Sequence, residues 1–356
     1  MEGCIRLPDK LLDKQLDKPP DMASAKTTVQ YKGYKRTNTM HERKITGHSL
    51  TPGKTIRDYI HVAGTVIQIP YVVICGTEPG PTVLITAGIH NAEYVGIQAA
   101  IELSNELDAS ELRGNVIIVP LVNRTGFENR TMSMVFEDGK NLNRVFPGSP
   151  SGSVADRIAY TLFEGLIRNV DAYIDLHGGD GYETLTPFAY YVGDTSAENA
   201  AKCMVSCVNV RFCVRSRCRN GGAYNMASVI GVPSVLIERG QLGLYSREEV
   251  DADKADVRNI LCCLGVTPGD YILYPKQELL EYDVVAPNTG CWYPGKKAGD
   301  SFRKGDTLGI IRDYFGSAVF TQYAPCDGIL LYQCSSLNIL ENGPMIAYGV
   351  PTSVKE

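Results

Sequence analysis

The sequence predicts an α/β protein in which a mixed central sheet is flanked by helices and followed by a small C-terminal all-β barrel or sandwich domain. Between residues 59 and 238, apolar segments of strand length alternate with segments of helical spacing, a pattern that is typical of α/β sheets. Near residue 278 the pattern changes, because Gly and Pro turns then recur at short intervals between short strands. These two observations define the predicted fold class.

Composition and charge narrow the possible functions. The chain has 356 residues, 44% hydrophobic and 21% charged, which is enough for one large domain and one small one. Its formal net charge is -5 and no basic run is long enough to follow a phosphate backbone, so we expect no nucleic-acid partner. No apolar run approaches the roughly 20 residues that span a bilayer. The 11 cysteines are scattered and odd in number, so we expect a reduced, cytoplasmic protein without a membrane partner.

We divide the chain into three regions. Residues 1–24 are charged, repeat Asp-Lys pairs and contain few apolar side chains, so we expect a disordered leader, either native or left over from expression. Met22 is an alternative start. Residues 25–275 form the predicted α/β domain, and residues 276–356 form the small β domain.

The α/β domain should alternate strands and helices along the chain. Pro70 should interrupt an early strand, and residues 76–81 should form a turn. Residues 123–153 lack strong periodicity, and a loop of that length is usually functional. We expect strands at residues 59–62, 65–69, 71–75, 83–86, 115–122, 171–177, 188–192 and 233–238, and helices at residues 94–107, 155–168 and 197–208, with a further helix before Pro233.

Polar residues stand at the ends of three of these strands. The three apolar strand segments finish in His90, His177 and Glu238. In open α/β sheets, ligands gather at the carboxyl ends of the strands. A lone histidine at a strand end is more often structural, but two of the five histidines in the chain hold this position. Jointly these residues predict a functional site.

His90 and Glu93 form an H-x-x-E pair at the predicted start of a helix. Side chains three residues apart share one helix face and can grip one ion, and an imidazole with a carboxylate suits zinc. The alternative is that both are ordinary helix-start residues. A second cysteine-based zinc site is not expected, because Cys203, Cys207, Cys213 and Cys218 have irregular spacing and no neighbouring histidine.

The C-terminal β domain contains two versions of one phrase, at residues 284–290 and 324–331. Its pattern of short strands separated by Gly and Pro turns is similar to that of biotinyl and lipoyl carrier modules. No Lys flanked by Met stands at a hairpin tip to carry a prosthetic group. We therefore interpret it as a structural domain or as a rim of the site.

Four phrases occur in order along the chain: GIHNAEYVG at residues 88–96, NLNRVFPG at 141–148, DLHGG at 175–179 and SVLIERGQLG at 234–243. With them the chain resembles the succinylglutamate desuccinylase/aspartoacylase family, a branch of the zinc carboxypeptidase-like fold. The resemblance covers nearly everything after residue 25. One residue departs from the family pattern, because Asn91 stands where the family usually has Gly. Asn tolerates a positive φ better than other non-glycine residues do, so we expect the turn to be kept.

The resemblance implies that His90, Glu93 and His177 bind one zinc ion and leave a fourth position open. Zinc lowers the pKa of water to near 7 and polarises the scissile carbonyl. Glu238 is then the implied general base, and its alternative is a strand-end carboxylate paired with Arg239.

The same resemblance implies an anion-binding side of the site. Arg144 and Asn143 are expected to bind substrate, because a guanidinium matches a carboxylate well. Arg130 is expected to stabilise the oxyanion of amide hydrolysis, although a plain surface arginine is the alternative. Asp175 lies two residues before His177 on the same strand face and is expected to orient its imidazole, or simply to end the strand.

These implications predict a zinc-dependent amide hydrolase that removes a small acyl group from an N-acyl amino acid or a related N-acyl amine. A zinc metallocarboxypeptidase is the alternative within enzymes, and a non-catalytic binding protein with the same fold is the alternative outside them. A small N-acyl molecule is the expected partner. The sequence leaves the acyl group, the amine and the oligomeric state open, a homo-oligomer included.

Overall fold

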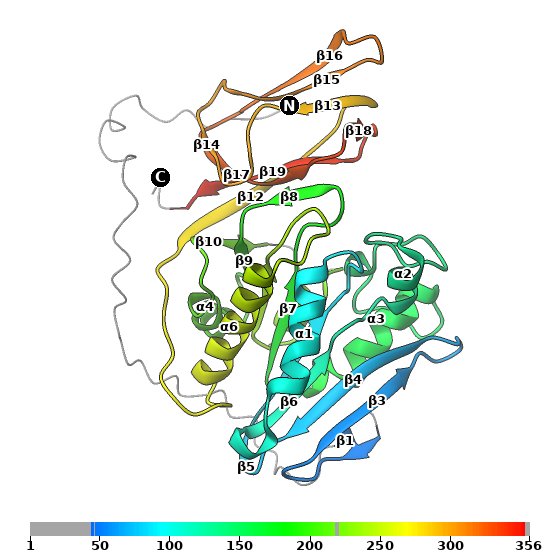
Figure 1. The fold of residues 1–356 in the computed structure, drawn as a ribbon, viewed down its shortest axis with the longest axis vertical. Coiled ribbons are helices and arrows are strands. Elements are labelled where there is room, and N and C mark those ends of the chain that lie inside the picture. The colour runs from blue at the N-terminus through cyan, green and yellow to red at the C-terminus, as the bar shows by residue number, and fades with distance from the viewer. Residues whose placement is uncertain (1–43, 46, 218–220, 353–356) are drawn as a thin grey trace.

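A single 13-stranded sheet runs through the computed structural model, which describes residues 44–45, 47–217 and 221–352 (Figure 1). The predicted leader, residues 1–24, lies outside the described residues. The strand order is β14-β17-β19-β12-β10-β9-β11-β7-β5-β6-β4-β3, with β8 (Glu183–Leu185) paired to β17. Parallel and antiparallel pairs both occur, so the predicted mixed α/β sheet is confirmed.

The strands that position the site lie at the centre of this sheet. β5 (Glu78–Ala87) is parallel to β6 (Arg113–Val119) on one side and to β7 (Ala172–His177) on the other. β7 is in turn parallel to β11 (Ser234–Glu238), whereas β11 is antiparallel to β9 (Phe188–Val192). These strands are apolar over most of their length because helices cover both faces of the sheet.

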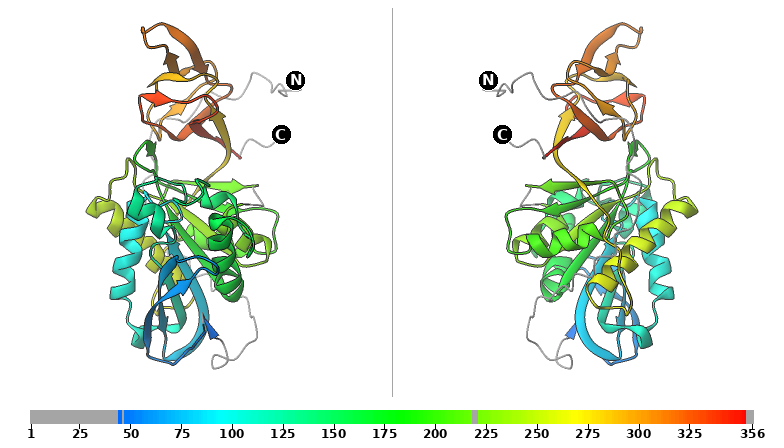
Figure 2. Two further views of the ribbon diagram at one scale, coloured as in Figure 1. Left: turned by 90° about the vertical axis from the view of Figure 1, so that its right-hand side faces the viewer. Right: turned by 90° about the vertical axis from the view of Figure 1, so that its left-hand side faces the viewer.

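The helices form two layers, one on each face of the sheet (Figure 2). On one face, apolar side chains of α1 (Tyr94–Glu106), α4 (Glu198–Ser206) and α6 (Arg247–Cys263) pack into one core cluster. On the other face, α3 (Val154–Gly165) and α5 (Ala223–Val229) pack into a second cluster. The carboxyl ends of β5, β7 and β11 therefore open at the same edge of a rigid three-layer unit.

Five sequence predictions need correction. Pro70 does not end a strand, because β4 (Gln68–Cys75) runs through it opposite β3 (Thr55–His61). Its missing N–H is tolerated since β6 pairs with β4 only from Val72 onward. The predicted turn at residues 76–81 largely belongs to β5, which carries an irregularity between Glu78 and Thr82.

The third and fourth corrections concern helices. The long loop at residues 123–153 contains α2 (Arg124–Asn129), which Asn123 caps by accepting the Gly126 N–H. The sequence interpretation also missed α6, although its capping signal is present: Ser246 accepts the Glu249 N–H, and Glu248 and Glu249 lie in the first turn. The short strands β8 and β10 (Phe212–Ser216) were missed too.

The C-terminal region is built of strands, as predicted. β12 (Gln277–Val285) pairs with β10 at its start and with β19 (Pro344–Pro351) along the rest of its length. β17 (Gly328–Cys334) and β14 (Ser301–Phe302) then extend the main sheet. A second, four-stranded sheet packs with them around Trp292; its strands are β16 (Ala318–Tyr323), β15 (Thr307–Arg312), β13 (Gly290–Pro294) and β18 (Asn338–Ile339). The domain boundary at residues 275 and 276 stays a prediction.

Within the described residues, no helix is both long enough and apolar enough to cross a membrane.

Asp253 of α6 predicts a measurable pH dependence of stability. It is buried, and neither carboxyl oxygen makes a hydrogen bond to a described residue. Burial raises its pKa to about 8; Arg239 opposes the shift, and Asp256 and Glu249 add to it. An unfolded Asp titrates near pH 4. The free energy of unfolding should therefore fall as the pH rises from about 4 to about 8, because the unfolded chain loses this proton first.

Replacing Asp253 with Asn should remove that dependence. The variant should gain at least about 2 °C in melting temperature over the wild type at pH 8, and a smaller amount at pH 5. Asp251→Asn is the matched control, since Asp251 is exposed on the same helix and paired with Arg247. A gain of equal size at both pH values would show that Asp253 is ionised throughout.

Candidate metal centre and active site

Three predicted ligands converge at the carboxyl edge of the sheet. After β5 ends, Gly88 takes a left-handed φ of 67°, and an added Cβ would lie 2.8 Å from the Leu121 side chain. This turn presents His90, and Glu93 immediately precedes α1. His177 ends β7. The ligand atoms of His90, Glu93 and His177 all lie within 4.8 Å of one another.

The carboxylate of Glu93 lies between the two imidazoles. Its Oε1 is 2.7 Å from His90 Nδ1, and its Oε2 is 2.8 Å from His177 Nδ1. Oε2 also accepts the Gly178 N–H at 3.2 Å. Burial would raise the pKa of Glu93, but the two histidines outweigh it and hold the pKa at about 2. A charged carboxylate thus faces the same nitrogen of both rings.

His90 is held by a residue that the sequence interpretation did not select. Asn141 Oδ1 lies 3.0 Å from His90 Nε2 and also accepts the Asn143 N–H at 2.9 Å. An oxygen that already accepts one hydrogen bond can accept another but cannot donate, so Nε2 carries the hydrogen. Nδ1, 2.7 Å from the Glu93 carboxylate, is then the nitrogen left to bind a metal, and a bound cation would take the place of its proton. Asn141 opens the NLNR phrase, so its position beside the ligands was the available signal.

His177 and Asp175 lie together at the end of β7, and both are buried. Asp175 Oδ1 accepts the Thr86 hydroxyl at 2.7 Å, and its Oδ2 is 3.4 Å from His177 Nε2, too long for a good hydrogen bond. Burial would lower the pKa of His177, but Glu93 and Asp175 raise it well above the usual value. The surroundings therefore favour a positive charge on or beside this ring.

The donor set fits a divalent cation. Two imidazole nitrogens and a carboxylate are ligands that zinc accepts, and three protein ligands are the pattern of an open, catalytic site. The fit also rests on charge: Glu93 and Asp175 surround His177 with negative charge inside the protein, and a bound cation would compensate that charge. Among the described residues this is the single group of three or more potential ligands that converge in this way.

Glu238 lies directly beside the triad. On the parallel strands β7 and β11 it is the register partner of His177, so the two side chains stand next to each other. Burial raises the pKa of Glu238 well above its usual value, and Glu93, Glu281 and Asp175 add to the shift while His177 opposes it. These surroundings favour the neutral carboxyl group over the carboxylate and make Glu238 a stronger base than an exposed glutamate.

The residues predicted for the anion-binding side are Asn143, Arg144 and Arg130. They differ in burial and in the contacts that their side chains make. Asn143 is buried, and its Oδ1 accepts the Ala223 N–H at 3.0 Å, which fixes the start of α5. Arg144 is exposed; burial raises the pKa of the Glu281 carboxyl, and Arg144 lies close enough to oppose part of that rise. Arg130 ends α2 with a φ of 55° and is exposed, without a hydrogen bond or ion pair from its side chain to any described residue.

An acidic and aromatic wall beside Glu238 was missed by the sequence interpretation. Glu281 of β12 accepts a hydrogen bond from Tyr190 of β9, and Tyr332 of β17 donates to Asp283 at 3.2 Å. Burial raises the pKa of Glu281 to about 7. The side chain of Glu183 on β8 makes no hydrogen bond or ion pair with a described residue; burial, then Glu238 and Glu93, raise its pKa well above normal. The C-terminal strands bring this wall to the site, so no local pattern could reveal it.

Asn91 does not occupy a left-handed turn position. The positive φ of this turn belongs to Gly88, and Asn91 is not among the described non-glycine residues with a positive φ. Its side chain is buried instead. The expected reason for tolerating Asn91 therefore does not apply. Of the cysteines considered above, Cys218 lies outside the described residues.

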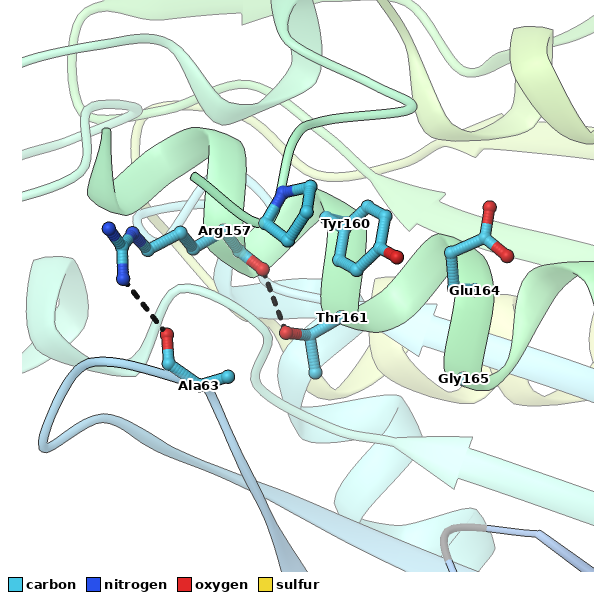
Figure 3. Close-up of a pocket in the computed structure, with 7 residues that line it drawn as sticks. Ala63, Arg157, Tyr160, Thr161, Glu164 and Gly165 are labelled. Atoms are coloured by element: carbon cyan, nitrogen blue, oxygen red, sulfur yellow. Dashed lines mark hydrogen bonds between the residues drawn. The ribbon is translucent and has the colours of Figure 1, made fainter. Parts of the chain in front are cut away.

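A hollow of about 230 Å³ lies elsewhere, against α3 (Figure 3). Arg157 crosses it to the Ala63 carbonyl, and the Thr161 hydroxyl donates to the Arg157 carbonyl. None of the residues that line it is a predicted ligand or the predicted base. We therefore do not assign it a catalytic role.

The fold and the site define an α/β protein with a His-Glu-His group that could hold a metal ion at the carboxyl edge of its sheet. The family model described as the succinylglutamate desuccinylase/aspartoacylase catalytic domain matches residues 79–264. The chain therefore belongs to the succinylglutamate desuccinylase/aspartoacylase family, as its motifs predicted. Residues of all four motifs and all three predicted ligands lie within the matched segment.

Relatives support the same assignment. An N-alpha-acetyl-L-2,4-diaminobutyric acid deacetylase from Halomonas elongata is 30% identical over 281 residues, which cover 74% of this chain and 80% of the relative. The product-bound ectoine utilization protein EutE (DoeB) from Ruegeria pomeroyi has a TM-score of 0.76 and 25% identity, covering 83% of this chain and 95% of that one. An aspartoacylase family protein from Mesorhizobium loti has the same fold, with a TM-score of 0.72, 24% identity, and 85% and 96% coverage. The protein is accordingly an amide-hydrolysing enzyme of the deacylase type.

Proposed function

We propose that this protein is a zinc-dependent deacylase that removes a small acyl group from an N-acyl amino acid or a related N-acyl amine. The observation that carries the proposal is the convergence of His90, Glu93 and His177 beside Glu238. In this proposal the three residues hold one zinc ion, which would supply Lewis acidity for activating water and polarising the scissile carbonyl.

Glu238 is the proposed general base. Its carboxyl group stands beside His177, and its raised pKa suits a group that takes a proton from water and later gives it to the leaving amine. The same proton can serve both steps, because the carboxyl group returns to its starting state after each turnover.

Arg144 and Asn143 are the proposed substrate-binding residues. Asn143 Oδ1 is occupied by the Ala223 N–H, so its Nδ2 is the part available to a substrate oxygen. Arg144 is exposed and can turn its guanidinium toward a substrate carboxylate. Arg130 remains the proposed oxyanion-stabilising residue, and its exposed side chain would have to move inward when substrate binds.

The acidic wall supports a substrate with a second amino group. The relative from Halomonas elongata acts on N-alpha-acetyl-L-2,4-diaminobutyric acid, whose side-chain amine is free to carry a positive charge. Glu183 and Glu281 lie near Glu238 and would attract such a charge. We therefore propose N-acetyl diamino acids as the first substrates to test.

A substrate panel tests the proposal. The zinc-loaded protein should release acetate from N-alpha-acetyl-L-2,4-diaminobutyric acid, and kcat/KM should be at least about 10-fold lower for N-acetylaspartate, which places a carboxylate near the acidic wall. Acetate and free amine are measured separately, so that both products of amide cleavage are counted.

Short peptides with free C-termini are the comparison that addresses the carboxypeptidase alternative. Release of a C-terminal amino acid from peptides, without acetate release from any N-acetyl compound, would favour that alternative. A protein that neither takes up zinc nor turns over any of these compounds would support the non-catalytic alternative instead.

A further inference from the structure

The first metal ligand is enclosed by a closed ring of polar contacts. His90 Nε2 faces Asn141 Oδ1 at 3.0 Å, and Asn141 forms an isolated antiparallel bridge with Met134. Asn123 Nδ2 donates to the Met134 carbonyl at 3.0 Å and to Asn91 Oδ1 at 2.9 Å. Asn91 is covalently joined to His90, which closes the ring. The ring thus begins and ends at the same ligand.

Asn91 and Asn123 are buried members of this ring of contacts. Both side chains are buried, with 1% and 0% of their surface exposed. Asn123 Oδ1 accepts the Gly126 N–H at 3.2 Å, and the Asn123 N–H donates to the Gly88 carbonyl at 2.9 Å. Asn123 is therefore bound both to α2 and to the turn that presents His90.

The fit around the two amides is tight. A Cβ added to Gly126 would lie 2.7 Å from Asn91 Oδ1 and 2.7 Å from Asn123 Oδ1. The amide pair can therefore approach α2 only because residue 126 is glycine. In the family pattern a glycine usually stands at position 91, and glycine has no side chain that could form this contact.

From these contacts we propose that Asn91 and Asn123 are positioning residues of the metal centre. The ring controls His90 at two points, its main chain through Asn91 and its Nε2 through Asn141, and both points lead to Met134. Losing the Asn91–Asn123 bond would let the main chain at His90 move relative to Asn141 and so turn Nδ1 away from Glu93. This inference rests on the proposed metal site.

Zinc affinity measures the proposal directly. Asn91→Ala, Asn123→Ala and the double variant are titrated with zinc in competition with a chromophoric chelator, and the metal-free forms are melted in parallel. Each single variant should bind zinc about 10- to 100-fold more weakly, the range for residues that orient a ligand. The double variant should be little worse than either single one, because both changes break the same bond.

Asn115→Ala is the matched control. Asn115 is also a buried asparagine but lies on β6, and its Nδ2 donates to Thr82 Oγ1 at 3.0 Å. Its loss should lower the melting temperature and leave zinc affinity unchanged. Asn91→Gly, which restores the family residue, provides a variant that keeps the turn if Asn91→Ala does not fold, and it should also bind zinc more weakly.

The outcomes separate the two proposals. If the wild type does not bind zinc, the proposed function and this inference both fail. If the wild type binds zinc and both Asn91 variants bind it equally well while melting at a lower temperature, the metal site stands and the positioning role is overturned.

Discussion

Glu238→Gln should lower kcat by about 10²- to 10⁴-fold, the usual contribution of a positioned general base, and should leave bound zinc in place. Gln has nearly the same size as Glu but cannot take a proton. Glu238 stands beside His177 in the register of β7 and β11 and is not one of the three converging ligands. Single-turnover rates and the zinc content of the purified variant measure both parts of this prediction.

Glu183→Gln is a suitable control for Glu238→Gln, because Glu183 is a neighbouring carboxylate without a proposed proton-transfer role. It should raise KM for N-acetyl diamino acids and change kcat little. Equal losses of kcat in the two variants would mean that Glu238 acts only through the general charge of the site. Retained turnover in Glu238→Gln would place the base elsewhere.

The second large effect is expected for Glu93→Gln. Each oxygen of Glu93 faces one imidazole, so it is the one negatively charged ligand and the centre of the triad. A neutral amide cannot supply that charge, and zinc affinity should fall by more than the roughly 100-fold that is typical for residues behind the ligands. Amide hydrolysis should fall with it. Elemental analysis after gel filtration, together with chelator competition, measures the loss.

Thermal unfolding gives an independent readout for Glu93→Gln. Because a ligand that binds only the folded state stabilises it, added zinc should raise the melting temperature of the wild type and not that of the variant. Glu102→Gln is the matched control on the same segment, since Glu102 lies on α1 and pairs with Arg247 and Lys254. A Glu93→Gln protein with one tightly bound zinc ion per chain would contradict the proposed ligand set.

The predictable part of the site was encoded locally. Apolar strands that end in His90, His177 and Glu238 imply a shared edge of the sheet, and the family motifs supplied the expected roles. The structure brings the ligand atoms of His90, Glu93 and His177, the three predicted ligands, within 4.8 Å of one another. The alternation of strands and helices can be read from the sequence, and it was enough to predict that these residues converge.

The parts of the site that the sequence did not predict depend on contacts between segments that are far apart in the chain. Glu281 and Tyr332 reach the site because β12 and β17 extend the main sheet, and nothing near either residue signals this. The role of Asn141 depends on where a loop folds back, and the exposure of Arg130 depends on where α2 ends. By contrast, α6 was missed despite a readable cap at Ser246, since its exposed face makes the segment as a whole polar.

The shared strand β12 has a consequence for how the protein unfolds. It is hydrogen-bonded to β10 of the α/β region and to β19 of the C-terminal region, and Leu279 pairs with both. Separating the regions would leave two unprotected sheet edges, which readily pair with other chains. The C-terminal region therefore covers an edge of the α/β region's sheet, in addition to lining the site. We expect the two regions to unfold as one cooperative unit.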